Sequence, residues 1–489
     1  MFVDLDLPAG FRRSGTDLQS RGRWRDGSLV RWRDGAMMPV GGWRERADFT
    51  SGIYRGSMAW EDNSGDRWLA VGSHSALKVS TLAGSVSDIT PVGFTSGNES
   101  ASLNTGYGSG AYGTGAHGTP RQATTFSEAT TWSMSPWGEY LIACSNADGK
   151  IYEWQLNTGT PAAAVTNAPT DCLGVVVTPE RFVFALGAGG EPRKVQWSDR
   201  EDNTTWTPAA TNEAGDQTLD GVGQIMCGFN VPGETLIVTD AEAYAATYQG
   251  PPFVYGFRRI GSACGIVSRK AIAATDSGAI WMGRKGFFRY QGGTVEEIEC
   301  EVADFIFGDI SEDQASKAHA VTNGQFGEVW FFFPCGSSTE VDKYVSYNYR
   351  SGFWAIGELA RTTGVDRGAF PQPVWVGSDS VANDHEVGLS YGGADIYAES
   401  GPLMLGSNAS LVTAQELHPD ETTQGDVTFT FKVRNYPNAA ETSHGPYTAA
   451  TPTNVRFTGR QIRMRADGAT LADWRVGAPR LRVAERGRR

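Results

Sequence analysis

A repeated pattern of short strands and glycine-containing turns constrains the fold of this chain more than any other feature. It is clearest at residues 273–293, AATDSGAIWMGRKGFFRYQGG. Residues 279–282 form an apolar, β-forming run between the triplets DSG and RKG, which both end in glycine. Glycine accepts the positive φ of a three-residue hairpin loop, so the stretch predicts strand, turn, strand, turn, strand. Such a meander is marginally stable alone and needs similar neighbours.

Looser copies of this meander recur along the chain, mostly at intervals of ~40 to 50 residues, the range of propeller blades. They lie at about residues 54–79, 131–154, 174–197, 222–248, 273–293 and 318–354, with a shorter candidate at 373–377. Each copy has apolar residues on both sides of a small sheet, and radial stacking of the sheets would bury them. The sequence therefore predicts an all-β fold with a β-propeller of six or seven blades at residues 48–395.

Two further segments flank the predicted propeller. Residues 1–47 read as an extended N-terminal arm, and residues 396–489 as a C-terminal β-rich segment with a basic tail. Residues 426–433 and 461–465 of the latter alternate between apolar and polar, as half-buried strands do. The 61 glycines and 15 tryptophans also fit many short strands and turns.

The arm contains a duplicated tetrapeptide, WRDG, at residues 24–27 and 32–35. Each copy predicts a strand edge that ends in an Asp-Gly turn. Its arginines can stack on aromatic rings or pair with aspartates. The arm then either packs on its own subunit or crosses to a neighbouring subunit or ring. Candidate contact residues are Arg23, Trp24, Arg25, Arg31, Trp32, Arg33 and Trp43 in the arm, with Arg460, Arg463 and Arg465 near the C-terminus.

Residues 95–125 are rich in Gly, Ser, Thr and Tyr and contain too few apolar residues for a core. They predict a long loop inserted between two blades. Two interpretations are open. The loop is either a surface insertion or a projection into a lumen or onto a partner, in which case Tyr107 and Tyr112 are candidate contact residues.

Charge is unevenly distributed along the chain, whose net charge is -13. Residues 1–47 hold 9 arginines and 6 acids, and residues 453–489 hold 10 arginines and 3 acids. The rest carries 23 basic and 46 acidic groups. An acidic body argues against wrapping nucleic acid and suits a surface that DNA slides past. The basic tail is either solvated or contacts an acidic partner ring or DNA phosphate.

Catalytic, phosphate-binding and metal-binding motifs are not evident in the sequence. The six cysteines and six histidines are scattered, so we predict buried reduced thiols, no metal, no cofactor and no enzymatic activity. Asp199 and Asp202 could bind a cation, although such clusters usually form turns. The N-terminus does not resemble a signal peptide. The longest apolar runs, such as residues 329–333, are too short to span a membrane, so we expect folding in the cytoplasm.

The order of several motifs resembles that of β-propeller tail hub or nozzle proteins of short-tailed bacteriophages, also called packaged-DNA stabilisation or head-completion proteins. The motifs that carry the resemblance are LQSRGRW at 18–24 with PVGGW at 39–43, VQWSD at 195–199 with TWTP at 205–208, TDSG at 275–278 with GFF at 286–288, and GRQIR at 459–463. Together they span most of the chain.

The resemblance implies a structural virion protein of the viral tail. Subunits of such proteins form a ring, typically a hexamer, below the portal and adaptor rings, which retains packaged double-stranded DNA and lets it pass without sequence recognition during DNA ejection. The implied partners are further copies of the chain, portal and adaptor proteins, and tail fibre or spike proteins. The family has no active site to transfer.

A different interpretation of the sequence is a glycan-binding or sialidase-like propeller that acts on the host surface. The turn at residues 275–278 resembles the Asp-containing blade turn of sialidase propellers. A sialidase would also need an arginine triad around a carboxylate and a Tyr–Glu pair.

Overall fold

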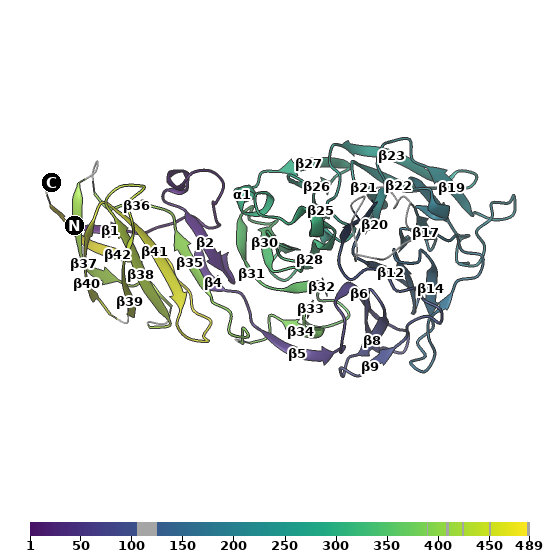
Figure 1. Ribbon diagram of the computed structural model, residues 1–489, viewed down its shortest axis with the longest axis horizontal. Coiled ribbons are helices and arrows are strands. Elements are labelled where there is room, and N and C mark those ends of the chain that lie inside the picture. The colour runs from purple at the N-terminus through teal and green to yellow at the C-terminus, as the bar shows by residue number, and fades with distance from the viewer. Residues whose placement is uncertain (105–124, 389, 407–409, 423–424, 449–450, 487–489) are drawn as a thin grey trace, which may run out of the picture.

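A computed structural model of the chain describes residues 1–489 except 105–124, 389, 407–409, 423–424, 449–450 and 487–489. Figure 1 shows two bodies side by side, a large ring of small sheets and a smaller pair of sheets that contains both chain ends. Within the described part, the helices are α1 (Ala303–Phe307) and the short 3-10 helices η1 (Asp17–Ser20), η2 (Ala188–Gly190) and η3 (Glu312–Lys317).

The ring is a seven-bladed β-propeller, which confirms the predicted fold class. Seven four-stranded antiparallel sheets of the described chain form its blades. Blades 1 to 3 comprise β6 (Tyr54–Glu61), β7 (Arg67–Ser73), β8 (Leu77–Thr81) and β9 (Val86–Asp88); β12 (Trp132–Trp137), β13 (Tyr140–Ser145), β14 (Ile151–Trp154) and β15 (Ala163–Ala164); and β16 (Gly174–Val177), β17 (Val183–Leu186), β18 (Lys194–Trp197) and β19 (Gly215–Thr218).

The remaining four blades follow in chain order, except for the outer strand of the last. Blades 4 and 5 comprise β20 (Ile225–Val231), β21 (Glu234–Thr239), β22 (Glu242–Gly250) and β23 (Val254–Ser262); and β24 (Ile272–Thr275), β25 (Gly278–Met282), β26 (Phe287–Gln291) and β27 (Thr294–Ile298). Blades 6 and 7 comprise β28 (His319–Asn323), β29 (Glu328–Phe333), β30 (Lys343–Asn348) and β31 (Trp354–Glu358); and β32 (Arg361–Val365), β33 (Val374–Gly377), β34 (Val381–His385) and β5 (Trp43–Asp48).

Blade 5 contains the stretch that predicts the repeat, and its strands lie where the pattern places them. The predicted three-residue loops are wrong, however. Thr275 pairs with Gly278 and Met282 with Phe287, which leaves loops of two and four residues. Gly278 lies within β25, where a Cβ would approach the carbonyl oxygen of Tyr290 to 2.0 Å. Glycine is therefore required here for close approach of two backbones, and not for a positive φ.

The ring closes through a strand from the N-terminal part of the chain. β5 pairs with β34 as the outer strand of blade 7, and Figure 1 shows it in purple beside the green strand β34. The first strands of blades 7 and 1, β32 and β6, also contact each other. The last residues of the predicted arm thus belong to a propeller sheet, and the blade number is seven.

The smaller body is a β-sandwich built from both ends of the chain. One sheet has the order β1 (Phe2–Asp4), β42 (Arg480–Arg486), β37 (Leu411–His418) and β40 (Thr453–Gly459). The other has the order β2 (Trp24–Ser28), β35 (Tyr397–Ser400), β41 (Gln461–Gly468), β38 (Val427–Arg434) and β39 (Thr442–Thr448), with β36 (Leu403–Met404) on β41. Apolar side chains from both sheets form one core, in which the rings of Phe431 and Phe457 lie 5.1 Å apart.

The duplicated WRDG tetrapeptides adopt different structures. Asp34 and Gly35, both with positive φ, form the turn between β3 (Val30–Arg33) and β4 (Ala36–Pro39), which confirms the second predicted turn. The first predicted turn is wrong, because Asp26 and Gly27 lie inside β2, which pairs with β35. A Cβ on Gly27 would approach the carbonyl oxygen of Tyr397 to 2.7 Å, so glycine again permits a close strand contact.

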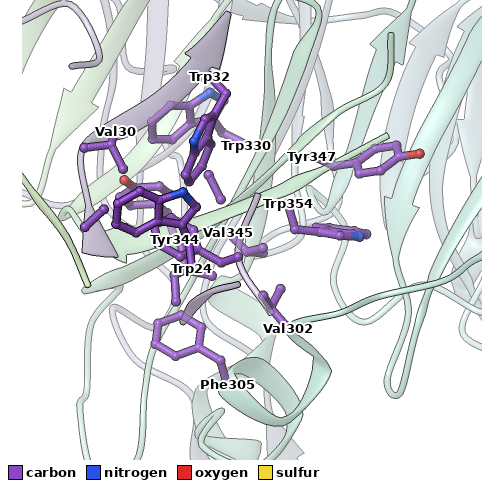
Figure 2. Close-up of a cluster of buried hydrophobic side chains, with 14 of the residues drawn as sticks. Trp24, Val30, Trp32, Val302, Phe305, Trp330, Tyr344, Val345, Tyr347 and Trp354 are labelled. Atoms are coloured by element: carbon purple, nitrogen blue, oxygen red, sulfur yellow. The ribbon is translucent and has the colours of Figure 1, made fainter. Parts of the chain in front are cut away.

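Aromatic packing joins this arm to the propeller. Figure 2 shows Trp24 and Trp32 against Tyr344 and Trp330 of blade 6. Trp24 and Trp32 are 3% and 5% exposed. In addition, the hydroxyl of Tyr344 accepts a hydrogen bond of 2.8 Å from the backbone N–H of Leu29. The arm, the sandwich and blades 5 and 6 therefore contribute to a single apolar core.

A buried ionic cluster lies beside this core. The Arg31 guanidinium lies 2.9 Å from a carboxylate oxygen of Glu328, on β29, and 2.6 Å from Glu386, which follows β34. All three side chains are 3–4% exposed. Trp330 Nε1 donates to Glu328 and Asn323 Nδ2 donates to Glu386. This cluster fixes the β3–β4 hairpin to two blades, because its charges depend on one another for solvation.

We expect Arg31→Met to lower the free energy of unfolding by about 3–5 kcal/mol, because it leaves two buried carboxylates without their cation. Urea unfolding followed by tryptophan fluorescence measures the change. The control is Arg33→Met in the same strand, where the side chain is 60% exposed and the expected change is below about 0.5 kcal/mol. Equal losses in the two variants would contradict the role of the cluster.

Candidate functional site

The candidate contact residues of the arm lie mostly within the chain's own interior. Arg23 pairs with Glu301 at 2.6 Å and Arg25 with Asp17 at 3.6 Å. Trp24, Arg31 and Trp32 are buried at the junction with blade 6. Arg33 is exposed and lies 3.7 Å from Asp34. Trp43 is half-buried, with its ring packed on His385 and Tyr391 and under the Arg361 guanidinium.

Two of the C-terminal candidate arginines form ion pairs in the sandwich. Arg463 contacts Asp17 at 2.5 Å, Glu441 at 3.0 Å and Glu399 at 3.6 Å. Arg465 pairs with Asp467 at 2.7 Å, and its guanidinium lies 3.7 Å from the ring centroid of Tyr397. Arg460 lies between β40 and β41, and its Nε is buried with no hydrogen-bond partner in the described chain.

Asp17 brings the two sets of candidates together. Its carboxylate contacts Arg25 of the arm and both Arg434 and Arg463 of the C-terminal segment. These cations lower the pKa of Asp17 even though burial raises it. The arm thus packs on its own chain, as one of the two sequence-based interpretations expects. Contacts of these residues with other subunits remain a prediction, and Tyr107 and Tyr112 lie outside the described residues.

A cavity of about 340 Å³ occupies the centre of the propeller. It is lined mainly by the first strands of the blades and by residues just before them, together with Leu186 at the end of β17. Its apolar lining includes Met58, Met134, Val175, Val176 and Phe229. No aspartate or glutamate occurs among the described residues that line it, although the chain carries a net charge of -13.

Basic residues gather where the first strands begin. They are Arg55, Arg269, Lys270, Lys317 and His319, at the starts of the first strands of blades 1, 5 and 6. The first strands of successive blades run in the same direction around the ring, so these positions share one end of the channel. This cationic end is the most distinctive electrostatic feature of the described channel.

Most of these cations have carboxylate partners outside the cavity. Arg55 and Lys317 both contact Glu340. Arg269 lies 3.0 Å from Glu128 and also donates to the carbonyl oxygens of Ile225 and Met226. The Arg269 guanidinium thereby links blade 5 to the first strand of blade 4.

Lys270 and His319 differ from the other basic residues. Within the described chain, neither the Lys270 ammonium nor the two His319 ring nitrogens have a hydrogen-bond or ion-pair partner. Burial lowers the pKa of Lys270 to about 8, an effect that the Cys227 thiol opposes. Burial also lowers the pKa of His319 to about 3, opposed by a backbone contact at Lys317 and helped by the charges of Arg55 and Lys270. His319 is therefore a neutral ring at pH 7, stacked 5.0 Å from Phe332.

The base of the predicted long loop covers part of this end of the channel. It includes the short hairpin of β10 (Ser102–Asn104) and β11 (Thr125–Ser127). The backbone of Ala101 exchanges two hydrogen bonds with the Gln314 side chain, and Ser100 accepts one from Lys317. With Glu128 bound to Arg269, this segment extends from between blades 1 and 2 to blades 5 and 6.

The other sites considered from the sequence are structural in the described chain. Asp202 accepts hydrogen bonds from Thr204 and Thr205, and Asp199 accepts one from the backbone of Glu213, as turn residues do. No group of three or more metal-ligating residues is found among the described residues. The six cysteines are free thiols, four of them buried. The part of the chain described includes no helix that is long and apolar enough to cross a membrane.

Comparison with known proteins gives distant likenesses of fold. No protein-family model matches the chain, and no curated protein matches it. The chain is similar to virginiamycin B lyase from Staphylococcus aureus, with 9% identity, a TM-score of 0.43, and coverage of 71% of this chain and 99% of the lyase. A streptogramin B lyase has 10% identity and a TM-score of 0.43, and the match covers 70% of this chain and 97% of the lyase. BamB from Moraxella catarrhalis has 10% identity and a TM-score of 0.32, and the match covers 79% of this chain and 98% of BamB.

The expectation that the chain is not an enzyme is corrected by this comparison. Two of the similar propellers are lyases, matched over nearly their whole length. The absence of familiar catalytic motifs from an all-β propeller, on which the expectation rested, therefore does not exclude catalysis. Identities of 9–10% assign no reaction to this chain.

Sequence reasoning missed the basic end of the channel. Comparison of the repeated meanders would have shown that Arg55, Lys270 and His319 all lie within two residues of the start of a first strand, in three of the blades. The signal was present in the sequence, but each residue alone resembles an ordinary charged residue beside a turn.

Protonation of His319 should make the fold sensitive to acid. Because the folded pKa of about 3 lies below the ordinary value of 6.5, the unfolded chain takes up this proton first. The free energy of unfolding therefore contains the full contribution of the neutral His319 ring above about pH 6.5. Below that pH the contribution falls by about 1.4 kcal/mol per pH unit.

The test compares the wild type with His319→Phe, which keeps the stacked ring, by urea unfolding from pH 8 to pH 4. We expect a constant difference in stability above about pH 7 and a growing relative loss in the wild type below about pH 6.5. A difference that stays constant down to pH 4 would contradict a buried neutral histidine.

Proposed function

We propose that the protein is a ring-forming structural subunit of a short bacteriophage tail, the tail hub or nozzle, which retains packaged DNA and provides its exit channel. The proposal combines the sequence resemblance with one structural observation: both basic ends of the chain fold into one body, apart from the acidic propeller. Residues 1–47 and 453–489 carry net charges of +3 and +7, and the rest carries -23. Most of the two basic segments lies in the sandwich or at its junction with the propeller.

This charge separation supports head-to-tail association. On the outer side of the sandwich, Arg480 and Arg482 are 63% and 56% exposed, and Arg456 is also exposed. Their surface ion pairs with Asp4 and Glu416 contribute little stability and can exchange for partners on another subunit. The outer propeller strands β19 and β27 expose Asp216, Glu296 and Glu297. A basic face that meets the acidic edge of the next copy makes a heterologous contact, which closes into a ring when the rotation allows.

The junction between the two bodies also suits a ring subunit. The Arg31 cluster and the tryptophans around it hold the sandwich and the propeller in one arrangement. A fixed angle between donor and acceptor surfaces is needed for a ring of defined size. The edge strand β39, mostly exposed along its length, offers a further surface for contact with other chains.

The proposal predicts assembly that depends on charge. Native mass spectrometry at low ionic strength, alone and with the portal–adaptor complex, should detect a ring of about six subunits that weakens as salt increases. Arg456→Glu combined with Arg480→Glu should weaken assembly at least tenfold, because both substitutions reverse charge on the basic face.

The control is Lys150→Glu, which makes one such charge reversal at an exposed propeller position and should leave the ring intact. Circular dichroism should show the same fold in all variants. A wild-type monomer that ignores the portal–adaptor complex would overturn the proposal. Equal assembly of the double variant and the wild type would overturn the charge-based contact.

A further inference from the structure

The central cavity contains a cation without a counterion. Lys270 precedes β24 and lines the cavity, while the described residues around it include no carboxylate. The Cys227 thiol from β20 and the His319 ring lie near it, and the backbones of Lys270 and His319 form a parallel bridge. Arg269 is already bound to Glu128 and to two carbonyl oxygens. In contrast, the positive charge of Lys270 has no carboxylate partner in the described chain.

We propose that this cavity is a binding site for a small organic anion, whose carboxylate or phosphate pairs with Lys270 and whose apolar part lies against the methionine and valine side chains of the channel. Lys270 is half-buried, so an anion that enters the cavity would form an ion pair that is screened less by water than a pair on the outer surface. The proposal is independent of the ring function proposed above.

The size and lining of the cavity define the class of ligand. A volume of about 340 Å³ lies at the lower end of the range for small-molecule sites, which are mostly apolar with a few placed polar groups. The lining is more polar than that average: Met58, Met134, Val175 and Val176 form its apolar part, and a comparable number of polar side chains form the rest. The hydroxyls of Ser57 and Thr363 also line the cavity and bond to each other at 2.8 Å.

Two further polar side chains of the lining, Ser133 and Asn230, are already hydrogen-bonded within the protein. Ser133 accepts a hydrogen bond from the backbone of Val175 at 2.8 Å, and the Asn230 amide donates to the carbonyl oxygen of Val177 at 2.7 Å. Burial raises the pKa of Cys227 to about 12, so this thiol stays neutral and supplies no anion. Within the described lining, Lys270 is therefore the group best placed to select a negatively charged ligand.

Calorimetric titration of the full chain with benzoate, phenyl phosphate and inorganic phosphate tests the site. We expect saturable binding of one molecule per chain for benzoate or phenyl phosphate, and weaker binding of inorganic phosphate, which lacks the apolar part. Lys270→Met should weaken the binding at least tenfold, and Lys270→Arg should retain part of it. The matched control is Lys285→Met, an exposed lysine in the same blade, which should bind like the wild type.

The pH dependence supplies a second readout that a merely structural lysine would not give. The pKa of about 8 for Lys270 means that affinity should be constant near pH 6.5–7 and fall about tenfold per pH unit well above 8. Cys227 and His319 stay neutral over this range.

Three results would overturn the proposal: no saturable binding of any of the three probes, equal binding by Lys270→Met and the wild type, or inorganic phosphate bound as tightly as phenyl phosphate. Circular dichroism of Lys270→Met establishes that a loss of binding is not a loss of fold. Ring assembly, measured on the same samples, separates failure of this site from failure of the proposed tail function.

Discussion

The ionic cluster of Arg31, Glu328 and Glu386 is the interaction on which the arrangement of the two bodies depends. A guanidinium with two carboxylates in a nearly dry site is stable only when every partner is present. Its members come from the arm, from blade 6 and from the segment after blade 7. The cluster therefore forms only after distant parts of the chain have met, and it then prevents the arm from moving independently of the propeller.

Two further features follow from this placement of the arm. β5 becomes the outer strand of blade 7, so the propeller closes with a strand from the start of the chain. β1 and β2 become strands of the sandwich, so both basic ends enter the same body. The basic ends of the sequence thus lie together in the sandwich, and most of the acidic middle forms the propeller. This separation of charge supports the proposed head-to-tail ring.

The channel shows the opposite relation between local and overall charge. The chain is acidic, yet the described lining of the propeller cavity has cations and no carboxylates. Glu340 contacts both Arg55 and Lys317 and Glu128 contacts Arg269 from outside the cavity, whereas Lys270 has no carboxylate partner in the described chain. The acidic surface expected for DNA passage concerns a ring of subunits, whereas this cationic pocket lies within a single propeller. The two proposals therefore concern different surfaces.

The sequence by itself determined the class of fold. Alternation and β-forming runs fix strands locally, and repetition of the meander at nearly constant spacing indicates radial stacking, because each small sheet must bury both faces. It also located residues 279–282 and 287–290 in strands and the Asp34-Gly35 turn. The sequence could not show that the two WRDG copies adopt different structures. Gly27 lies in a strand because it pairs closely with the strand Tyr397–Ser400, which is far away along the chain. The blade number, the partners of Arg31 and Asp17, and the position of Lys270 in a cavity free of described carboxylates were decided only by the tertiary structure, because each depends on contacts between residues hundreds of positions apart.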